Sequence, residues 1–197
     1  MEYGSRLRFA LFTIGAIILL ILSIWGVSSI AKSIFKSGSS SKQPVVQTIA
    51  LEDYARPNTV TKMTAEGPIV AEEKFKSYEI NVAQDYREIK IYKGYNKSIV
   101  SSQRYPNNPE AYENFLKALK KANFTLKNKG SSEDEKGACA TGARFIYQVD
   151  DDQKEAFRSW GTKCGSLGSS KGQGSAIRNL FESQIPDFRD MAAETDI

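Results

Sequence analysis

The chain has 197 residues, of which 41% are hydrophobic and 25% are charged, values that fit one globular domain with its own core. It contains no histidine, which excludes a Ser-His-Asp triad, a Cys-His dyad and a histidine-based zinc site. The net charge is +4, and most of this excess lies near the N-terminus, so the rest of the chain lacks the clustered positive field that nucleic acid needs. We therefore predict no nucleic-acid partner, and no pattern in the sequence indicates a metal or a cofactor.

A segment without charged residues runs from Phe9 to Ala31. As an α-helix, about 22 of these residues would span roughly 33 Å, enough to cross a hydrocarbon core of about 30 Å. Trp25 lies near one end, where an amphipathic ring prefers the membrane interface. We predict a transmembrane helix over residues 9–31 that anchors the chain in the lipid bilayer. The alternatives are a buried helix of a soluble domain and a cleaved signal peptide, although the apolar part of a signal peptide is usually shorter, about 7–15 residues.

Basic residues flank both ends of this segment, so the positive-inside rule alone does not decide its orientation. A short basic tail followed by a large C-terminal domain is the usual layout of a signal anchor, with the N-terminus in the cytoplasm and the domain outside. The stretch KSGSSSKQP after the segment is rich in glycine and serine, which predicts a flexible tether. We therefore assign residues 1–8 to a cytoplasmic tail, 32–58 to the tether and 59–197 to an extracytoplasmic domain.

Several later segments alternate apolar and polar residues with the period of a β-strand. We predict strands over Thr59–Glu66, Phe75–Val82, Arg87–Lys93 and Ser98–Tyr105, of which the second and third form an antiparallel hairpin. A helix then begins after Asn108, a good N-cap that is followed by a proline. Its apolar residues repeat at i, i+3, i+4 and i+7 and predict one stripe that packs on the sheet: Tyr112, Phe115, Leu116 and Leu119.

Two cysteines bracket a second predicted hairpin, in which alternating residues continue on both sides of the turn cluster Asp150–Gln153. If Val149 pairs with Lys154, the same register places Cys139 directly opposite Cys164, within reach of a disulfide. We predict this disulfide, which would stabilise the fold by about 3 kcal/mol and indicates an oxidising compartment. Two unrelated buried thiols are the alternative.

The segment Gly165–Ser175 reads GSLGSSKGQGS and leads into a helix that we expect to begin near Ser175, its N-cap. Glycines before a helix N-terminus can bind phosphate, but neither the P-loop pattern nor the dinucleotide-binding pattern is present. If a ligand binds here, the residues that we predict to contact it are Lys171, Gly172, Gly174 and Ser175. A mobile loop without a ligand is the alternative.

Two pairs of acidic residues have the chemistry for hydrolysis of a glycoside polymer, but no diagnostic spacing. Glu110 and Glu113 lie near the N-terminal end of the predicted helix, where the helix dipole favours negative charge. Glu79 and Glu88 fall on the solvent side of the first hairpin. Both pairs therefore have an ordinary structural explanation, and we predict no catalytic residue and no enzymatic activity.

The C-terminal third contains the words YQV, RSWGTKCG and IRNLFESQIPDF. With these words, it resembles uncharacterised single-pass membrane proteins of small-genome bacteria that carry a small extracytoplasmic domain. The resemblance implies the layout of an anchor followed by a domain, and it implies no activity.

We expect an α+β fold, in which an N-terminal transmembrane helix precedes an antiparallel sheet of five or six strands with two packed helices and a disulfide-stapled hairpin. The predicted function is an interaction or structural module in the cell membrane that binds envelope proteins, such as an accessory subunit of an envelope, secretion or pilus assembly. Two alternatives stay open: a receptor for a small ligand or an anion at the loop 165–175, and a carboxylate-dependent envelope hydrolase.

Overall fold

The computed structural model describes residues 45–47, 49–129, 134–165, 167–193, 195 and 197. The chain divides into two units, Met1–Lys42 and Gln43–Ile197. The predicted cytoplasmic tail and transmembrane helix, residues 1–31, lie outside the described residues. In the part of the chain that is described, no helix is both long and apolar enough to cross a membrane.

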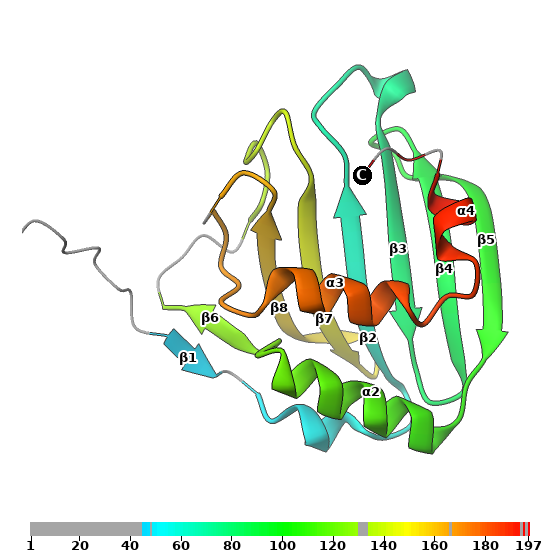
Figure 1. Ribbon diagram of the computed structural model, residues 1–197, viewed down its shortest axis with the longest axis vertical. Helices are drawn as coiled ribbons and strands as arrows, with labels where there is room; N and C mark the ends of the chain where they lie inside the picture. The colour runs from blue at the N-terminus through cyan, green and yellow to red at the C-terminus, as the bar shows by residue number, and fades with distance from the viewer. Residues whose placement is uncertain (1–44, 48, 130–133, 166, 194, 196) are drawn as a thin grey trace, which may run out of the picture. The chain divides into compact units, whose positions relative to one another are not determined.

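A six-stranded antiparallel sheet with the strand order β5-β4-β3-β2-β7-β8 is the centre of the described domain (Figure 1). Its strands are β2 (Thr59–Glu66), β3 (Lys76–Val82), β4 (Tyr86–Lys93), β5 (Ser98–Pro106), β7 (Arg144–Asp151) and β8 (Lys154–Thr162). The first four form a meander, and β7 then pairs with the free side of β2. The predicted sheet and its first hairpin are thus confirmed, with β2 at the predicted bounds.

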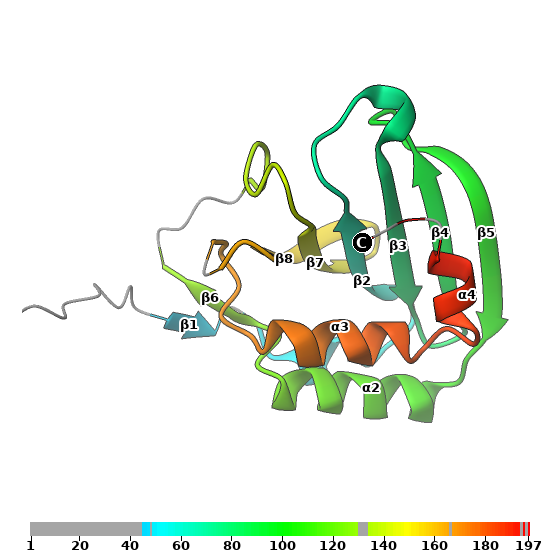
Figure 2. The same cartoon turned by 45° about the horizontal axis from the view of Figure 1, so that its top comes forward.

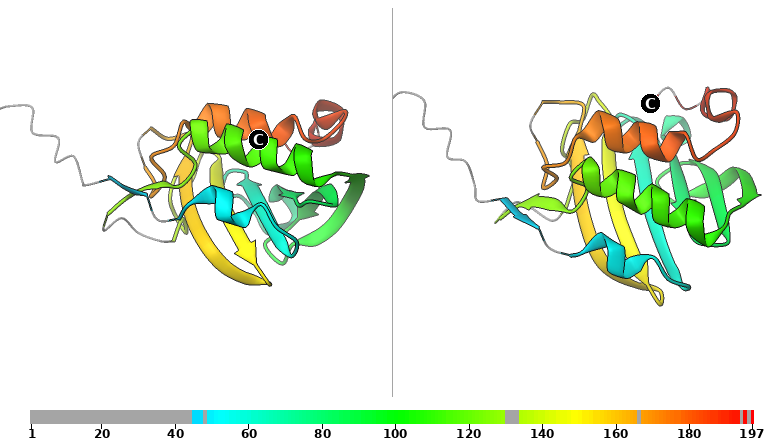
Figure 3. Two further views of the ribbon diagram at one scale, coloured as in Figure 1. Left: turned by 90° about the horizontal axis from the view of Figure 1, so that it is seen from below. Right: turned by 60° about the horizontal axis from the view of Figure 1, so that its bottom comes forward.

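Two helices cover one face of this sheet, α2 (Pro109–Lys121) and α3 (Gly174–Glu182) (Figures 2 and 3). Helix α2 begins as predicted, because the Ala111 amide donates to the Asn108 side chain over 2.9 Å. Its predicted apolar stripe is buried in the core. A third, short helix, α4 (Phe188–Ala192), was not predicted.

The core lies between these helices and the sheet, because alternate strand residues point towards the helices. The strand residues that share this face include Met63, Ala65, Tyr78, Ile80, Val82, Ile89, Phe145, Tyr147 and Val149. Aromatic rings fill the space under the helices, and the rings of Phe115 on α2 and Phe181 on α3 meet edge to face with centroids 5.1 Å apart.

Folded structure is present inside the segment 32–58 that we assigned to the tether. Strand β1 (Val45–Gln47) pairs with β6 (Leu126–Asn128) in a separate two-stranded sheet. The 3-10 helix η1 (Leu51–Tyr54) follows, and Leu51 is only 1% exposed in the core. The tether boundary at residue 58 is therefore wrong, because the glycine- and serine-rich composition ends at Pro44 and apolar residues that pack against the core follow it.

The predicted disulfide between Cys139 and Cys164 is present, with a Cα–Cα distance of 5.5 Å. The register that we used to predict it is wrong, because Val149 pairs with Phe157 and not with Lys154. The turn consists of two residues, Asp152 and Gln153, with φ angles of 47° and 65°. A two-residue turn with two positive φ angles fits the twist of a hairpin better than the four-residue turn that we expected.

A second turn explains how the cysteines still meet. In the observed ladder, Arg144 pairs with Thr162. If this register continued for two more residues, Gly142 would lie opposite Cys164. The Gly142 amide donates to the Cys139 carbonyl oxygen over 3.0 Å, so the chain folds Cys139 back over this glycine. A Cβ atom at Gly142 would lie 2.7 Å from the Cys139 sulfur, and the absence of a side chain there makes room for the disulfide.

Candidate functional site

The glycine-rich segment lines a cavity of about 270 Å³ between β7, β8 and the start of α3. We call it the glycine-rich pocket, and its lining includes Phe145, Tyr147, Lys171, Gly172, Gly174 and Arg178. Three of the four residues that we predicted to contact a ligand thus line one cavity. The fourth, Ser175, lies beside it, and its hydroxyl accepts a hydrogen bond of 3.3 Å from Arg178.

Hydrogen bonds tie the described part of this segment to two neighbouring parts of the domain. The Ser170 amide donates to the Trp160 carbonyl oxygen over 2.9 Å, and the Lys171 amide donates to that of Leu126 over 2.8 Å. A Cβ atom at Gly172 would lie 2.8 Å from the Asn123 carbonyl oxygen. Gly172 is therefore required for packing against the end of α2, whether or not a ligand binds.

The start of α3 gives the pocket a positive character. The helix begins at Gly174, and its N-cap Gln173 makes no side-chain hydrogen bond, so our prediction of Ser175 as the N-cap is wrong. Uncapped amides at a helix start attract negative charge. The guanidinium of Arg178 lies 4.4 Å from the Phe145 ring centroid, and Lys171 lines the same cavity.

The Tyr147 side chain completes the wall of the pocket as a hydrogen-bond donor. The residue is 1% exposed, and burial is the main reason that its pKa is raised to about 12. Its hydroxyl therefore keeps its proton at neutral pH. Two cations, a neutral hydroxyl and helix amides surround this cavity, an arrangement that suits a small anion.

The acidic pairs that we considered for hydrolysis lie on solvent-facing surfaces. On the outer face of the sheet, Glu79 accepts a hydrogen bond of 2.9 Å from Asn81, and Glu88 forms an ion pair of 3.0 Å with Lys90. On α2, Glu113 forms an ion pair of 2.6 Å with Lys117 one turn later. These contacts give the carboxylates structural roles in the described domain.

Exposed apolar side chains lie at one end of the sheet, and we did not predict them from the sequence. We call this group the apolar tip, and its members are Ile69, Val70, Tyr95, Ile99 and Val100, which are between 39% and 59% exposed. They come from the loop before η2 (Glu72–Lys74), from the β4–β5 turn and from the start of β5. The signal was the pair Ile99-Val100, which breaks the alternation of the predicted strand.

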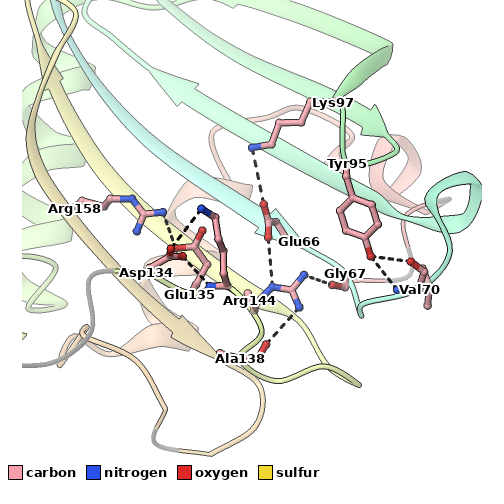
Figure 4. A network of polar contacts seen from close by, with 11 residues as sticks. Glu66, Gly67, Val70, Tyr95, Lys97, Asp134, Glu135, Ala138, Arg144 and Arg158 are labelled. Atoms are coloured by element: carbon pink, nitrogen blue, oxygen red, sulfur yellow. Dashed lines mark hydrogen bonds and ion pairs between the residues drawn. The ribbon is translucent and has the colours of Figure 1, made fainter.

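The apolar tip is held in place by contacts on both sides of Tyr95. The Tyr95 hydroxyl donates to the Val70 carbonyl oxygen over 2.8 Å and accepts from the Val70 amide over 3.1 Å (Figure 4). The Tyr95 ring stacks on the buried Phe75 ring with centroids 4.1 Å apart. The Tyr95 amide donates to the Glu72 carboxylate over 3.1 Å. The exposed side chains therefore sit on an ordered support.

A polar network lies next to the apolar tip (Figure 4). Arg144, which is 3% exposed, contacts the Glu66 carboxylate over 3.3 Å and donates to the Gly67 and Ala138 carbonyl oxygens over 2.8 and 3.4 Å. Lys97, in the β4–β5 turn, lies 3.9 Å from the other oxygen of Glu66. This arrangement connects the turn that carries Cys139 to β2.

Comparisons of the chain with protein-family models, with curated proteins and with solved structures found no match. The resemblance of the C-terminal third to bacterial single-pass membrane proteins therefore stays a prediction.

Proposed function

We propose that this protein is a membrane-anchored interaction module that binds a protein of the cell envelope through its apolar tip. In this proposal, residues 9–31 cross the cell membrane, the N-terminus is cytoplasmic and the folded domain is extracytoplasmic. The observation that carries the proposal is the exposure of five large apolar side chains at one end of the sheet. Side chains of this kind at one exposed site mark protein-binding surfaces more often than scattered ones do.

The location of the tip fits a tethered domain. The described chain enters the domain at β1, and the loops that carry the tip lie at the far end of the sheet from β1 (Figure 1). An accessory subunit of an envelope, secretion or pilus assembly would use such a surface.

Two further features support an extracytoplasmic location of the domain. The disulfide is stable where the environment is oxidising, as it is outside the cytoplasm. The uncharged segment 9–31 has the length and composition of a membrane anchor. Ordinary thiols at both positions in protein taken from cells, measured by alkylation without reduction, would contradict an extracytoplasmic domain.

Photo-crosslinking of the full-length protein in cells tests the binding surface. A photoreactive amino acid replaces Ile99 in one variant and Lys117, an exposed residue of α2, in the control. We expect Ile99 to capture one or two recurrent envelope proteins that Lys117 does not capture, and V100D in the same chain to abolish this capture. Equal capture from both positions would contradict a role for the tip.

A second candidate function is that of an anion receptor, which the lining of the glycine-rich pocket favours. Lys171, Arg178 and the start of α3 provide positive charge around a cavity of about 270 Å³. Titration with inorganic phosphate, followed by NMR of the backbone amides, tests it. We expect shifts at Gly172 and Gly174 that R178Q removes and K117Q leaves unchanged. Shifts of the same size throughout the domain would exclude a specific site.

A further inference from the structure

One edge of the six-stranded sheet is partly closed by the chain itself. On β8, Gly161 forms a bridge with Gly168, and the Trp160 carbonyl oxygen accepts from the Ser170 amide over 2.9 Å. The Trp160 amide donates to the Ser169 hydroxyl over 3.0 Å. A side chain at Gly168 would collide with the Trp160 carbonyl oxygen, so the glycine permits this close approach.

The other edge, β5, has no such cover among the described residues. The strand order ends at β5, and residues 98–104 are all exposed. Edge strands are usually protected by lysines, prolines, bulges or a covering segment. In β5, a register shift opposite Ile91 and Tyr92 protects the start of the strand. Pro106 protects its end. The five residues between them, Ser101–Tyr105, contain one charged side chain, Arg104.

The ladder shows which backbone groups of β5 face outwards. The Asn107 amide donates to the Asp85 carbonyl oxygen over 3.0 Å, so Asp85 and Asn107 form a bonded pair. The same register continues along the two strands and pairs Ile89 with Gln103. In an antiparallel ladder, bonded pairs alternate with non-bonded pairs, so residues 101, 103 and 105 bond to β4. The N–H and C=O groups of Ser102 and Arg104 therefore point away from the sheet.

We infer that β5 accepts an extended segment of a partner protein as an additional strand, with an apolar residue against Ile99 and Val100 and a carboxylate near Arg104. This inference rests on the proposed function and specifies how the partner binds. The outward amides and carbonyls would supply main-chain hydrogen bonds, and the apolar tip would supply a side-chain contact. Ile99 and Val100 are 58% and 59% exposed and lie directly before the open part of the strand.

The carboxylate follows from the surroundings of Arg104. Its guanidinium lies 3.6 Å from the Tyr86 ring centroid, which fixes its position on the surface. Its ion pair with Asp85 is long, at 3.8 Å, and the Asp85 side chain is 79% exposed. Glu88 lies opposite Arg104 in the ladder but forms its ion pair with Lys90. An acidic residue on an added strand would thus meet an oriented cation whose ion pair with Asp85 is long.

A second copy of this chain fits the same edge less well. If two β5 strands paired symmetrically with Ser102 opposite Ser102, Val100 of each copy would face Arg104 of the other. The two apolar tips would then lie at opposite ends of the new ladder and would not cover each other. A partner of different sequence can place its apolar residue at the tip and its acidic residue at Arg104.

Panning of a phage-displayed library of random twelve-residue peptides on the full-length protein in lipid nanodiscs tests this inference. We expect enriched peptides to alternate apolar and polar residues and to contain an acidic residue. S102P removes an outward N–H and no bond to β4, so it should weaken binding of the best peptide about tenfold or more. S102A keeps that N–H and should bind within about twofold of the original chain. Thermal unfolding first establishes that both variants fold.

The outcomes separate the two proposals. Equal binding by S102P and S102A would overturn strand addition but leave the apolar tip as a binding surface, whereas undiminished binding by I99D would contradict the proposed function itself. If S102P does not fold, amide exchange in the original chain decides. Exchange at Ser102 and Arg104 that slows with peptide supports strand addition, and unchanged exchange overturns it. A dimer without peptide that S102P dissociates would assign the edge to a second copy.

Discussion

The hairpins β7–β8 and β4–β5 each pair a strand of eight residues with a strand of nine, yet they lie at opposite ends of the sheet and are finished in different ways. The β7–β8 hairpin has a disulfide at its base, the buried Arg144 beside it and the segment 168–170 along its edge. The β4–β5 hairpin has exposed apolar residues and an open edge. The closed hairpin thus carries more of the contacts that stabilise the fold, whereas the open hairpin carries the surface that we propose for binding.

Among the substitutions that compare the two hairpins, we expect R144M to have the largest effect on the free energy of unfolding. The substitution keeps an unbranched apolar stem but removes the guanidinium that the Glu66 carboxylate and the Gly67 carbonyl oxygen bind. We expect a loss of about 3 kcal/mol in the free energy of unfolding, measured with urea. R104M on the open hairpin is the control and should cost less than about 1 kcal/mol. Equal losses would show that the arginines of the two hairpins contribute equally to the free energy of unfolding.

Removal of the disulfide should have a similar or slightly smaller effect. The variant C139S/C164S should lose about 3 kcal/mol, because the unfolded chain regains the freedom of the closed loop. A reducing agent should destabilise the original chain by the same amount and leave the variant unchanged. If the variant unfolds at the same urea concentration as the original chain, the bond does not support the closed hairpin.

Alkaline pH should destabilise the core under the closed hairpin. Burial raises the pKa of Tyr147 and of Tyr112 to about 12, against about 10 in an unfolded chain. Both hydroxyls are neutral below pH 10, where their contribution is complete. It is lost as the pH rises from about 10 towards 12, because the unfolded state then releases protons more readily. Y147F should reduce this loss by about 1.3 kcal/mol between pH 9 and pH 11, measured by urea unfolding, and an unchanged loss would contradict the assignment.

The smallest effect on stability should come from the apolar tip. Because Ile99 is 58% exposed, I99T should change the free energy of unfolding by less than about 0.5 kcal/mol. The matched substitution I146T, on β7, affects a side chain that is 3% exposed and should cost about 2 kcal/mol. Chemical unfolding of both variants tests the contrast. A large cost at Ile99 would indicate a structural role for the tip.

Elements with strong periodic patterns could be predicted from the sequence. Strand β2, helix α2 with its Asn108 cap and the first hairpin occur where alternation, the capping residue and the apolar stripe indicated. The short elements β1, β6 and α4 have too few residues to show a period, and pairing over long sequence distances stabilises β1 and β6. Such pairing is not visible in a single segment.

The second hairpin and the candidate sites show where local patterns fail. The Asp150–Gln153 cluster predicted a turn but not which two residues form it, and a shift in register followed. The cysteines were correctly paired because the additional turn at Gly142 compensates for that shift. Lys171 and Gly172 could be selected from composition, but Tyr147 and Arg178 reach the same pocket only through the fold.

The pairing of β1 with β6 has a mechanical consequence. A force that pulls on the N-terminal side of the domain reaches β1 first, and among the described residues three residue pairs join this strand to β6. The next firm point is Leu51, which is 1% exposed in the core. Release of β1 would free the segment up to Leu51, which has a contour length of about 20 Å at roughly 3.4 Å per residue. Under tension, β1 would thus detach from β6 before the six-stranded sheet unfolds.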